Sequence, residues 1–229
     1  MQFGPLEIAK YPLGLLNLVK REIGGIVFYH FNMVQNERFK KNLEILKQRV
    51  SNADEIYLEN MRLKALLDFK KQSQYKLVAA RVIGRSPDNW SSVVIIDKGK
   101  GCGIKRGMVT LTPLGLIGRV IDVTGSTAKI MLINDPNFSV SSIVQRSRQE
   151  GLVSGTLGGV LMMKYLPNDA DIKVSDVVLT SGLTEMYPKG LPVGSVTEVG
   201  DEFSGLTRYA LIKPAAELTN CEEVLVIIR

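Results

Sequence analysis

The feature that most restricts the fold of this chain is an internal repeat in its second half. The segment "IKRGMVTLT", residues 104–112, aligns with "IKVSDVVLT", residues 172–180. A second match follows each copy, "GLIGRV" at residues 115–120 and "GLPVGSV" at residues 190–196. Both copies predict a turn, a strand, a turn and a strand. Glycines stand where a barrel corner needs a positive φ or no side chain, so we interpret them as corners of two small β-barrels and not as a ligand site.

Short runs rich in Val, Ile, Leu and Thr, bounded by Gly, Pro, Asn and Asp, continue through the rest of this half. Their close spacing leaves no room for crossover helices, so we expect closed or stacked antiparallel sheets. The segment "GLVSGTLGG", residues 151–159, is interpreted as a flexible hairpin or inter-barrel connection in preference to an anion-binding loop. Eleven runs are expected to form strands: 77–83, 93–97, 109–112, 117–123, 127–132, 140–145, 160–165, 177–180, 193–199, 209–213 and 224–228.

Before the strands, a heptad pattern indicates a coiled coil. The apolar residues that repeat at intervals of 4-3-4-3-4 are Phe39, Leu43, Leu46, Val50, Ala53 and Tyr57. Beyond them Leu63, Leu66 and Leu67 continue the apolar stripe on a shifted face. Two interpretations follow: a dimer with Phe39, Leu43, Leu46 and Val50 at its seam, which we favour, or a helix packed on its own domain.

The segment at residues 11–34 is amphipathic, with Lys20 and Arg21 beside an apolar face that suits a partner helix or a membrane surface. No apolar run approaches the ~20 residues that span a bilayer. The chain is therefore expected to be mainly β, with an N-terminal helix or coiled coil followed by two small antiparallel β-barrels. Residues 1–70 would form a juxtamembrane segment and the coiled-coil helix, residues 76–150 the first barrel and residues 151–229 the second. Whether the last strand returns to the first barrel is left open.

Residues that could carry catalysis do not form a recognisable set. Two joined barrels invite comparison with chymotrypsin-type proteases, whose serine needs a histidine base. The only histidine, His30, lies in the helical segment, which leaves Ser154 and Ser181 without a base. The acidic pairs 169/171 and 222/223 read as solvated turn residues. The sequence therefore predicts no enzyme, no cofactor and no metal site.

Cysteine content and charge restrict the other functional classes. Cys102 and Cys221 are the only cysteines; we favour unpaired thiols, and whether the two pair is left open. The net charge of +6 is divided evenly along the chain, which is typical of a solvated surface. Aromatic residues do not alternate with Lys and Arg, so nucleic acid is not an expected partner.

Three aromatic residues stand in loop-like surroundings and are candidates for contact with a partner: Trp90, Tyr187 and Phe203. Packing inside the barrels is the alternative for each of them.

Several motifs in order resemble one bacterial family. They are "VAARVIGRSPDNWSSVVIIDKGKGCGIKRGMVTLTPLGLIGRV", "INDPNFSVSSIVQRSRQEGLVSGT", "YPKGLPVGSV" and "IKPAAELTNCEEVLVI". Over about residues 40–229 the chain is similar to the rod shape-determining proteins of the MreC family.

The resemblance implies a non-catalytic scaffold of the cell-elongation machinery that controls rod shape. Such proteins dimerise through a coiled coil, and their β domains bind and activate the penicillin-binding transpeptidase of elongation in peptidoglycan synthesis. They also associate with the membrane protein MreD, indirectly with the actin-like MreB, and with further copies of themselves.

The family is anchored by one N-terminal transmembrane helix, which this chain lacks, and works on the extracytoplasmic (periplasmic) face of the cytoplasmic membrane. We therefore expect the sequence to be the extracytoplasmic part. Two rival classes fit less well: an envelope-transport adaptor would show two antiparallel helical halves, and a cell-wall hydrolase would need a catalytic set.

Overall fold

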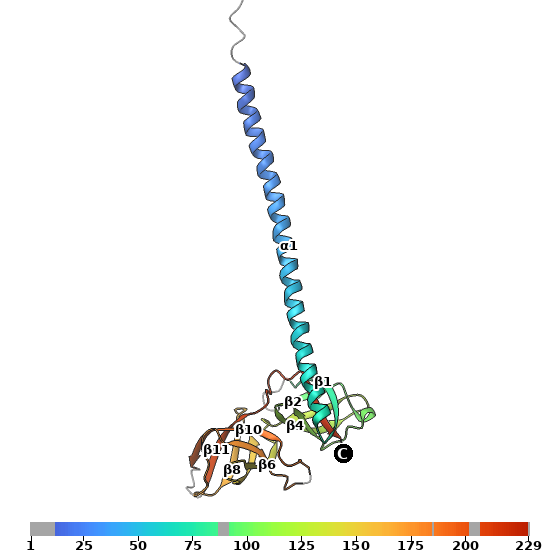
Figure 1. Ribbon diagram of the computed structural model, residues 1–229, viewed down its shortest axis with the longest axis vertical. Coiled ribbons are helices and arrows are strands. Elements are labelled where there is room, and N and C mark those ends of the chain that lie inside the picture. Colours follow the sequence, from blue (N-terminus) through green and yellow to red (C-terminus); the bar gives the residue numbers. More distant parts are fainter. Residues whose placement is uncertain (1–11, 87–91, 185, 202–206, 229) are drawn as a thin grey trace, which may run out of the picture. The chain divides into compact units, whose positions relative to one another are not determined.

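The computed structural model describes residues 12–86, 92–184, 186–201 and 207–228, with only the backbone for residues 12–32 and 34 (Figure 1). The chain divides into two compact units, Met1–Arg62 and Leu63–Arg229. Helix α1, Pro12–Gln72, is followed by strands that close into two barrels. The mainly β architecture with an N-terminal helix and two antiparallel barrels is confirmed.

Helix α1 is continuous through the glycines at residues 24 and 25, although glycine is a poor helix former. Pro12 occupies its first position, where the missing N–H costs nothing. Near the other end Leu66 is buried and Phe69 packs against the barrel core, so the last turns belong to the β unit. Lys70 and Lys71 stand in the last turn, where positive charge complements the helix dipole.

The first barrel closes in the order β1-β12-β3-β4-β5-β2, and each of its pairs is antiparallel. The short helix η1, Lys100–Cys102, lies between β2 and β3. The interior of the first barrel is filled by fully buried aliphatic side chains such as Ile96, Ile117 and Ile130. The strands are β1 Lys76–Arg85, β2 Val93–Ile96, β3 Val109–Thr112, β4 Gly115–Val123, β5 Ala128–Leu132 and β12 Glu223–Ile228.

The second barrel closes in the order β10-β11-β8-β7-β6-β9, again with antiparallel pairs. Strand β7, with the sequence "EGLVSG", is a twelfth strand beyond the eleven expected runs. It pairs with β8, and the two form the hairpin that was one of the two interpretations of residues 151–159. The strands are β6 Ser139–Val144, β7 Glu150–Gly155, β8 Leu161–Leu166, β9 Val177–Thr180, β10 Pro192–Asp201 and β11 Arg208–Pro214.

The two barrels exchange one strand. In the same direction around each barrel the orders β3-β4-β5-β2-β1-β12 and β9-β10-β11-β8-β7-β6 correspond strand for strand. Strands β1–β6 and β7–β12 are thus two repeats in sequence, and the sixth strand of each completes the other barrel. The boundary expected between residues 150 and 151 falls after the first residue of β7, near the junction of the two repeats. It does not separate the barrels, because β6 belongs to the second barrel and β12 to the first.

The glycines of the repeat occupy the predicted corners. A Cβ on Gly118 would lie 2.0 Å from the Met131 carbonyl oxygen, and one on Gly194 would lie 2.2 Å from that of Lys213. Two backbones approach so closely there that only glycine fits. This close approach agrees with their interpretation as barrel corners.

Candidate interaction surfaces

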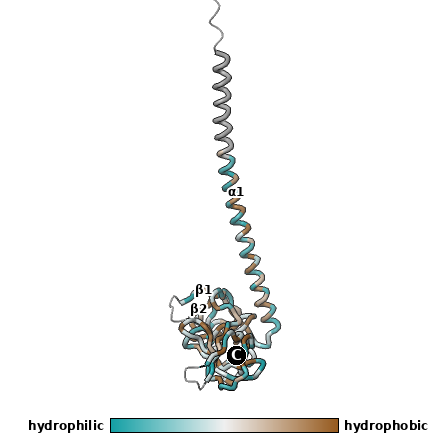
Figure 2. Tube along the Cα trace, turned by 90° about the vertical axis from the view of Figure 1, so that its left-hand side faces the viewer, coloured by the Kyte–Doolittle hydropathy of each residue, from teal (hydrophilic) through white to brown (hydrophobic). Residues whose placement is uncertain are grey.

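The coiled-coil residues predicted on α1 are exposed within the chain. Phe39, Leu43, Leu46 and Val50 are between 55% and 64% exposed. Brown apolar and teal polar residues alternate along this part of the helix (Figure 2). Burying one large apolar side chain yields ~1.5–3 kcal/mol, so this stripe, the seam of the helix, offers a strong driving force for association.

The prediction that Tyr187 contacts a partner is contradicted by its burial. It is 5% exposed, and its ring packs edge-on against Phe138 with centroids 6.0 Å apart. Burial raises the pKa of the Tyr187 hydroxyl to about 12, while the charge of Arg119 acts in the opposite direction. Tyr187 is a core residue, because the loop that carries it folds back over the barrel. Trp90 and Phe203 lie outside the described residues.

Tyr165 is an exposed aromatic residue that the sequence did not single out. Regular alternation from the buried Leu161 and Met163 would point its side chain into the barrel. Instead Lys164 and Tyr165 together lie opposite the single residue at position 209 of β11, which is a β-bulge. The bulge gives Tyr165 a φ of 62° and leaves its side chain 69% exposed. No local sequence signal predicts this reversal.

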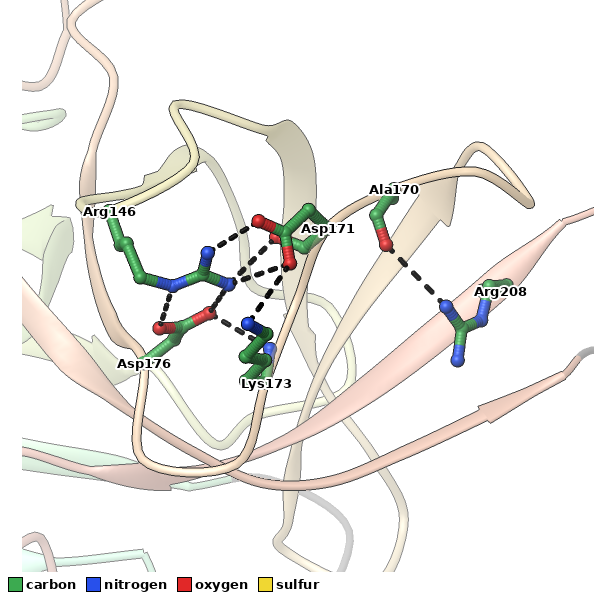
Figure 3. A network of polar contacts seen from close by, with 6 residues as sticks. All are labelled: Arg146, Ala170, Asp171, Lys173, Asp176 and Arg208. Carbon is green, nitrogen blue, oxygen red and sulfur yellow. Dashed lines mark hydrogen bonds and ion pairs between the residues drawn. The ribbon is translucent and has the colours of Figure 1, made fainter.

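A charged cluster closes one corner of the second barrel (Figure 3). The Arg146 guanidinium donates from Nε to Asp176 Oδ1 at 2.8 Å and from Nη2 to Asp176 Oδ2 at 2.9 Å. It also donates to both carboxylate oxygens of Asp171. Asp176 Oδ2 accepts the backbone N–H of Lys173 at 2.9 Å. These bonds join the turn after β6 to the segment before β9.

The electrostatics of this cluster suit structure and not catalysis. Hydrogen bonds from Arg146 lower the pKa of both Asp171 and Asp176, and the same bonds, those of Asp176 first, raise the pKa of Arg146. Carboxylates held ionised in this way are poor proton donors near neutral pH. Among the described side chains, no three His, Cys, Asp or Glu gather as a metal ion would require.

The cysteines are separate thiols. Cys102 is exposed on η1, Cys221 is buried, and both are free. Burial raises the pKa of Cys221 to about 11, so its thiol stays neutral and weakly nucleophilic. In the described part of α1 no stretch is apolar enough to cross a lipid bilayer.

Comparison with known proteins gives one consistent family. The family model described as "Rod shape-determining protein MreC, barrel core" matches residues 82–228. The chain belongs to the MreC family. The cell shape-determining protein MreC of Listeria monocytogenes is 33% identical over 219 residues, which cover 93% of this chain and 74% of that protein. The Bacillus subtilis protein of the same name is 32% identical and covers 85% of this chain, with 72% of its own length.

Solved structures of MreC agree in fold. The Listeria structure is 35% identical, has a TM-score of 0.63, and covers 85% of this chain and 96% of its own. A complex between PBP2 and MreC from Helicobacter pylori contains a chain that is 17% identical, with a TM-score of 0.55, over 67% of this chain and 99% of that one. At that identity the likeness shows the fold alone. As a member of the MreC family the chain is a cell shape-determining protein and a non-catalytic scaffold, not an enzyme.

Proposed function

We propose that the chain is a dimeric scaffold of the cell-elongation machinery on the periplasmic face of the cytoplasmic membrane, anchored there by a transmembrane helix. In this proposal α1 forms the dimer, and the β-barrels bind and activate the penicillin-binding transpeptidase of elongation. Association with MreD, indirectly with MreB, and with further copies of the chain completes the assembly. The observation that carries the proposal is the exposed apolar seam of α1.

Dimerisation is supported by spacing and exposure together. The seam residues Phe39, Leu43, Leu46 and Val50 keep heptad intervals and are all more than half exposed, whereas Leu66 further along the helix is covered by the chain's own barrel. A parallel partner helix would bury these four seam residues in knobs-into-holes packing. The competing interpretation, a helix packed on its own domain, accounts only for the end that includes Leu66 and Phe69.

Binding of a transpeptidase is supported by family membership and by the H. pylori MreC, whose structure is a complex with PBP2. Tyr165 is our candidate contact on the second barrel. An exposed aromatic ring on a bulged, paired strand is a preorganised anchor, because little conformational entropy is lost when a partner covers it.

Light scattering of Leu46→Glu tests the dimer. The wild-type chain should have twice the 25.3 kDa mass of one chain, and the variant should have the mass of one, since two carboxylates would face each other in an apolar seam. Asn52→Glu adds the same charge two residues beyond the seam residue Val50, off the heptad positions, and should remain a dimer. A wild-type monomer at high concentration would refute the proposal.

Interferometry with the purified ectodomain of the elongation transpeptidase tests the partner. Saturable binding to the wild-type chain is expected. Absence of binding at concentrations that saturate self-association would refute the partner while leaving the dimer intact, so the two parts of the proposal fail separately.

A further inference from the structure

The sequence repeat places two equivalent corners in the β unit, one before β3 and one before β9. In the first, the N–H of Gly107 bonds to the Val120 carbonyl at 2.8 Å; in the second, the N–H of Ser175 bonds to the Val196 carbonyl at 2.8 Å. Both residues have positive φ, 88° and 74°. The two corners therefore share one backbone conformation, and their side chains can be compared position by position.

The corner of the second barrel satisfies its own charges. Asp176 accepts the backbone N–H of Lys173, and Arg146 balances Asp176 and Asp171 (Figure 3). The four charged side chains of this corner, Arg146, Asp171, Lys173 and Asp176, each have a partner of opposite charge within the same barrel.

The corner of the first barrel has the same backbone conformation, but its positive charges are not balanced by carboxylates of the described residues. Met108 stands where the second barrel has Asp176, and its sulfur lies 3.2 Å from the Lys105 backbone nitrogen. Lys105 and Arg106 are exposed, and within the described residues neither side chain has an ion pair with a carboxylate. Two cations are thus left without the compensation that the equivalent corner possesses.

These cations border two adjoining hollows. The first, of about 400 Å³, has a floor of Met108, Met186, Pro188 and Ile227, and none of the described residues that line it carries a carboxylate. The second, of about 550 Å³, shares Lys105 and Arg106 and adds Lys100. Its one carboxylate, Asp122, lies 3.9 Å from Lys129 Nζ. The result is an apolar floor bordered by three lysine and arginine side chains.

We propose that these hollows form a docking groove for an extended segment of a protein partner in which apolar side chains alternate with Asp or Glu. The carboxylates of the segment would pair with Lys105, Arg106 and Lys100, supplying in trans the charge that Asp176 and Asp171 supply to the second barrel. Its apolar side chains would cover the floor, where two flexible methionines can adapt to their shape. The residues that line this groove include neither the seam residues of α1 nor Tyr165.

The composition of the floor favours a peptide over a phosphate or a lipid headgroup. An inorganic anion would engage only the charged border and leave the partly exposed side chains of Met108 and Met186 facing water. Charged pairs at an open border add little affinity by themselves, so the buried apolar side chains would supply most of it.

Selection from a displayed library of random peptides, each of about twelve residues and so long enough to cross both hollows when extended, tests the groove. With the full chain as bait, peptides in which Asp or Glu alternates with apolar residues are expected. Lys105→Glu combined with Arg106→Glu should weaken their binding at least tenfold. Lys164→Glu combined with Lys213→Glu, the same charge change on the second barrel, should leave it unchanged.

Met108→Asp is a second variant that keeps the corner folded. The new carboxylate would accept the Lys105 N–H as Asp176 accepts that of Lys173, so thermal stability should be retained while peptide binding falls. Selected peptides without acidic enrichment, or binding that survives both variants, would overturn the proposal. The proposal would also be overturned if vesicles of anionic lipids bound the chain through Lys105 and Arg106 and acidic peptides did not bind it.

Discussion

Tyr165 combines backbone strain with exposure at a single residue. A residue with a side chain at φ 62° costs roughly 1–2 kcal/mol of folding free energy. Glycine avoids this cost, but it offsets part of that stabilisation because it gives the unfolded chain more conformational entropy. We therefore expect Tyr165→Gly to be about 0.5–1 kcal/mol more stable than Tyr165→Ala in urea unfolding. Equal stability would mean that the bulge imposes no strain.

The same pair of variants separates strain from contact. If the Tyr165 ring touches the transpeptidase, both variants should weaken binding to a similar extent although their stabilities differ. Weakening in only one of them would assign the effect to the backbone and not to the ring.

Asp176 links the stability of the second barrel to pH. The hydrogen bonds from Arg146 lower its pKa in the folded state below the ordinary value of 3.8, so they stabilise the fold above that value, and the contribution is lost as the pH falls through the folded pKa. Asp176→Asn should lower the melting temperature at pH 7, and the difference from wild type should shrink below about pH 4.

Asp201→Asn is the matched control, because the Asp201 side chain is largely exposed where it meets Arg208 Nε at 3.1 Å. Exposed pairs contribute little to stability, so its melting temperature should stay near that of wild type at every pH. A deficit of Asp176→Asn that persists undiminished in acid would show that packing and not charge is responsible.

The exchanged strands β6 and β12 make the two barrels depend on each other. Val226 of β12 and Val153 of β7 are both fully buried, one in each barrel. Either Val→Ala change should cost about 2 kcal/mol, and both should lower the same calorimetric transition of the β unit. Two resolved transitions, each moved by only one of the variants, would show that the barrels unfold independently despite the exchange.

Local patterns were enough to predict most elements but not their pairing. The heptads, the glycine corners and eleven of the strands follow from spacing within short windows. The exchange does not, because β6 and β12 are both short strands and nothing in the sequence of either specifies which barrel it completes. For the same reason the sequence did not predict that Tyr187 is buried, because its segment has the composition of an exposed loop. It also did not predict that Tyr165 is exposed, because the β-bulge depends on pairing with β11.

At the scale of the whole molecule, a dimeric seam and a partner-binding β unit in one chain would produce bivalence. Two weak sites joined in a dimer can bind a dense array of partners roughly 100-fold or more tightly than one site does. This expectation rests on the proposed function, in which α1 forms the dimer and the β-barrels bind the transpeptidase.

Interferometry at two surface densities measures that bivalence. On a densely loaded transpeptidase surface the wild-type chain should dissociate at least about tenfold more slowly than Leu46→Glu, because release requires both sites to open together. On a sparse surface, where neighbouring transpeptidases are too far apart to bridge, the two proteins should dissociate at the same rate. A variant that is weaker on both surfaces would show that the dimer shapes the site itself, and equal rates on both would show that each dimer engages a single transpeptidase.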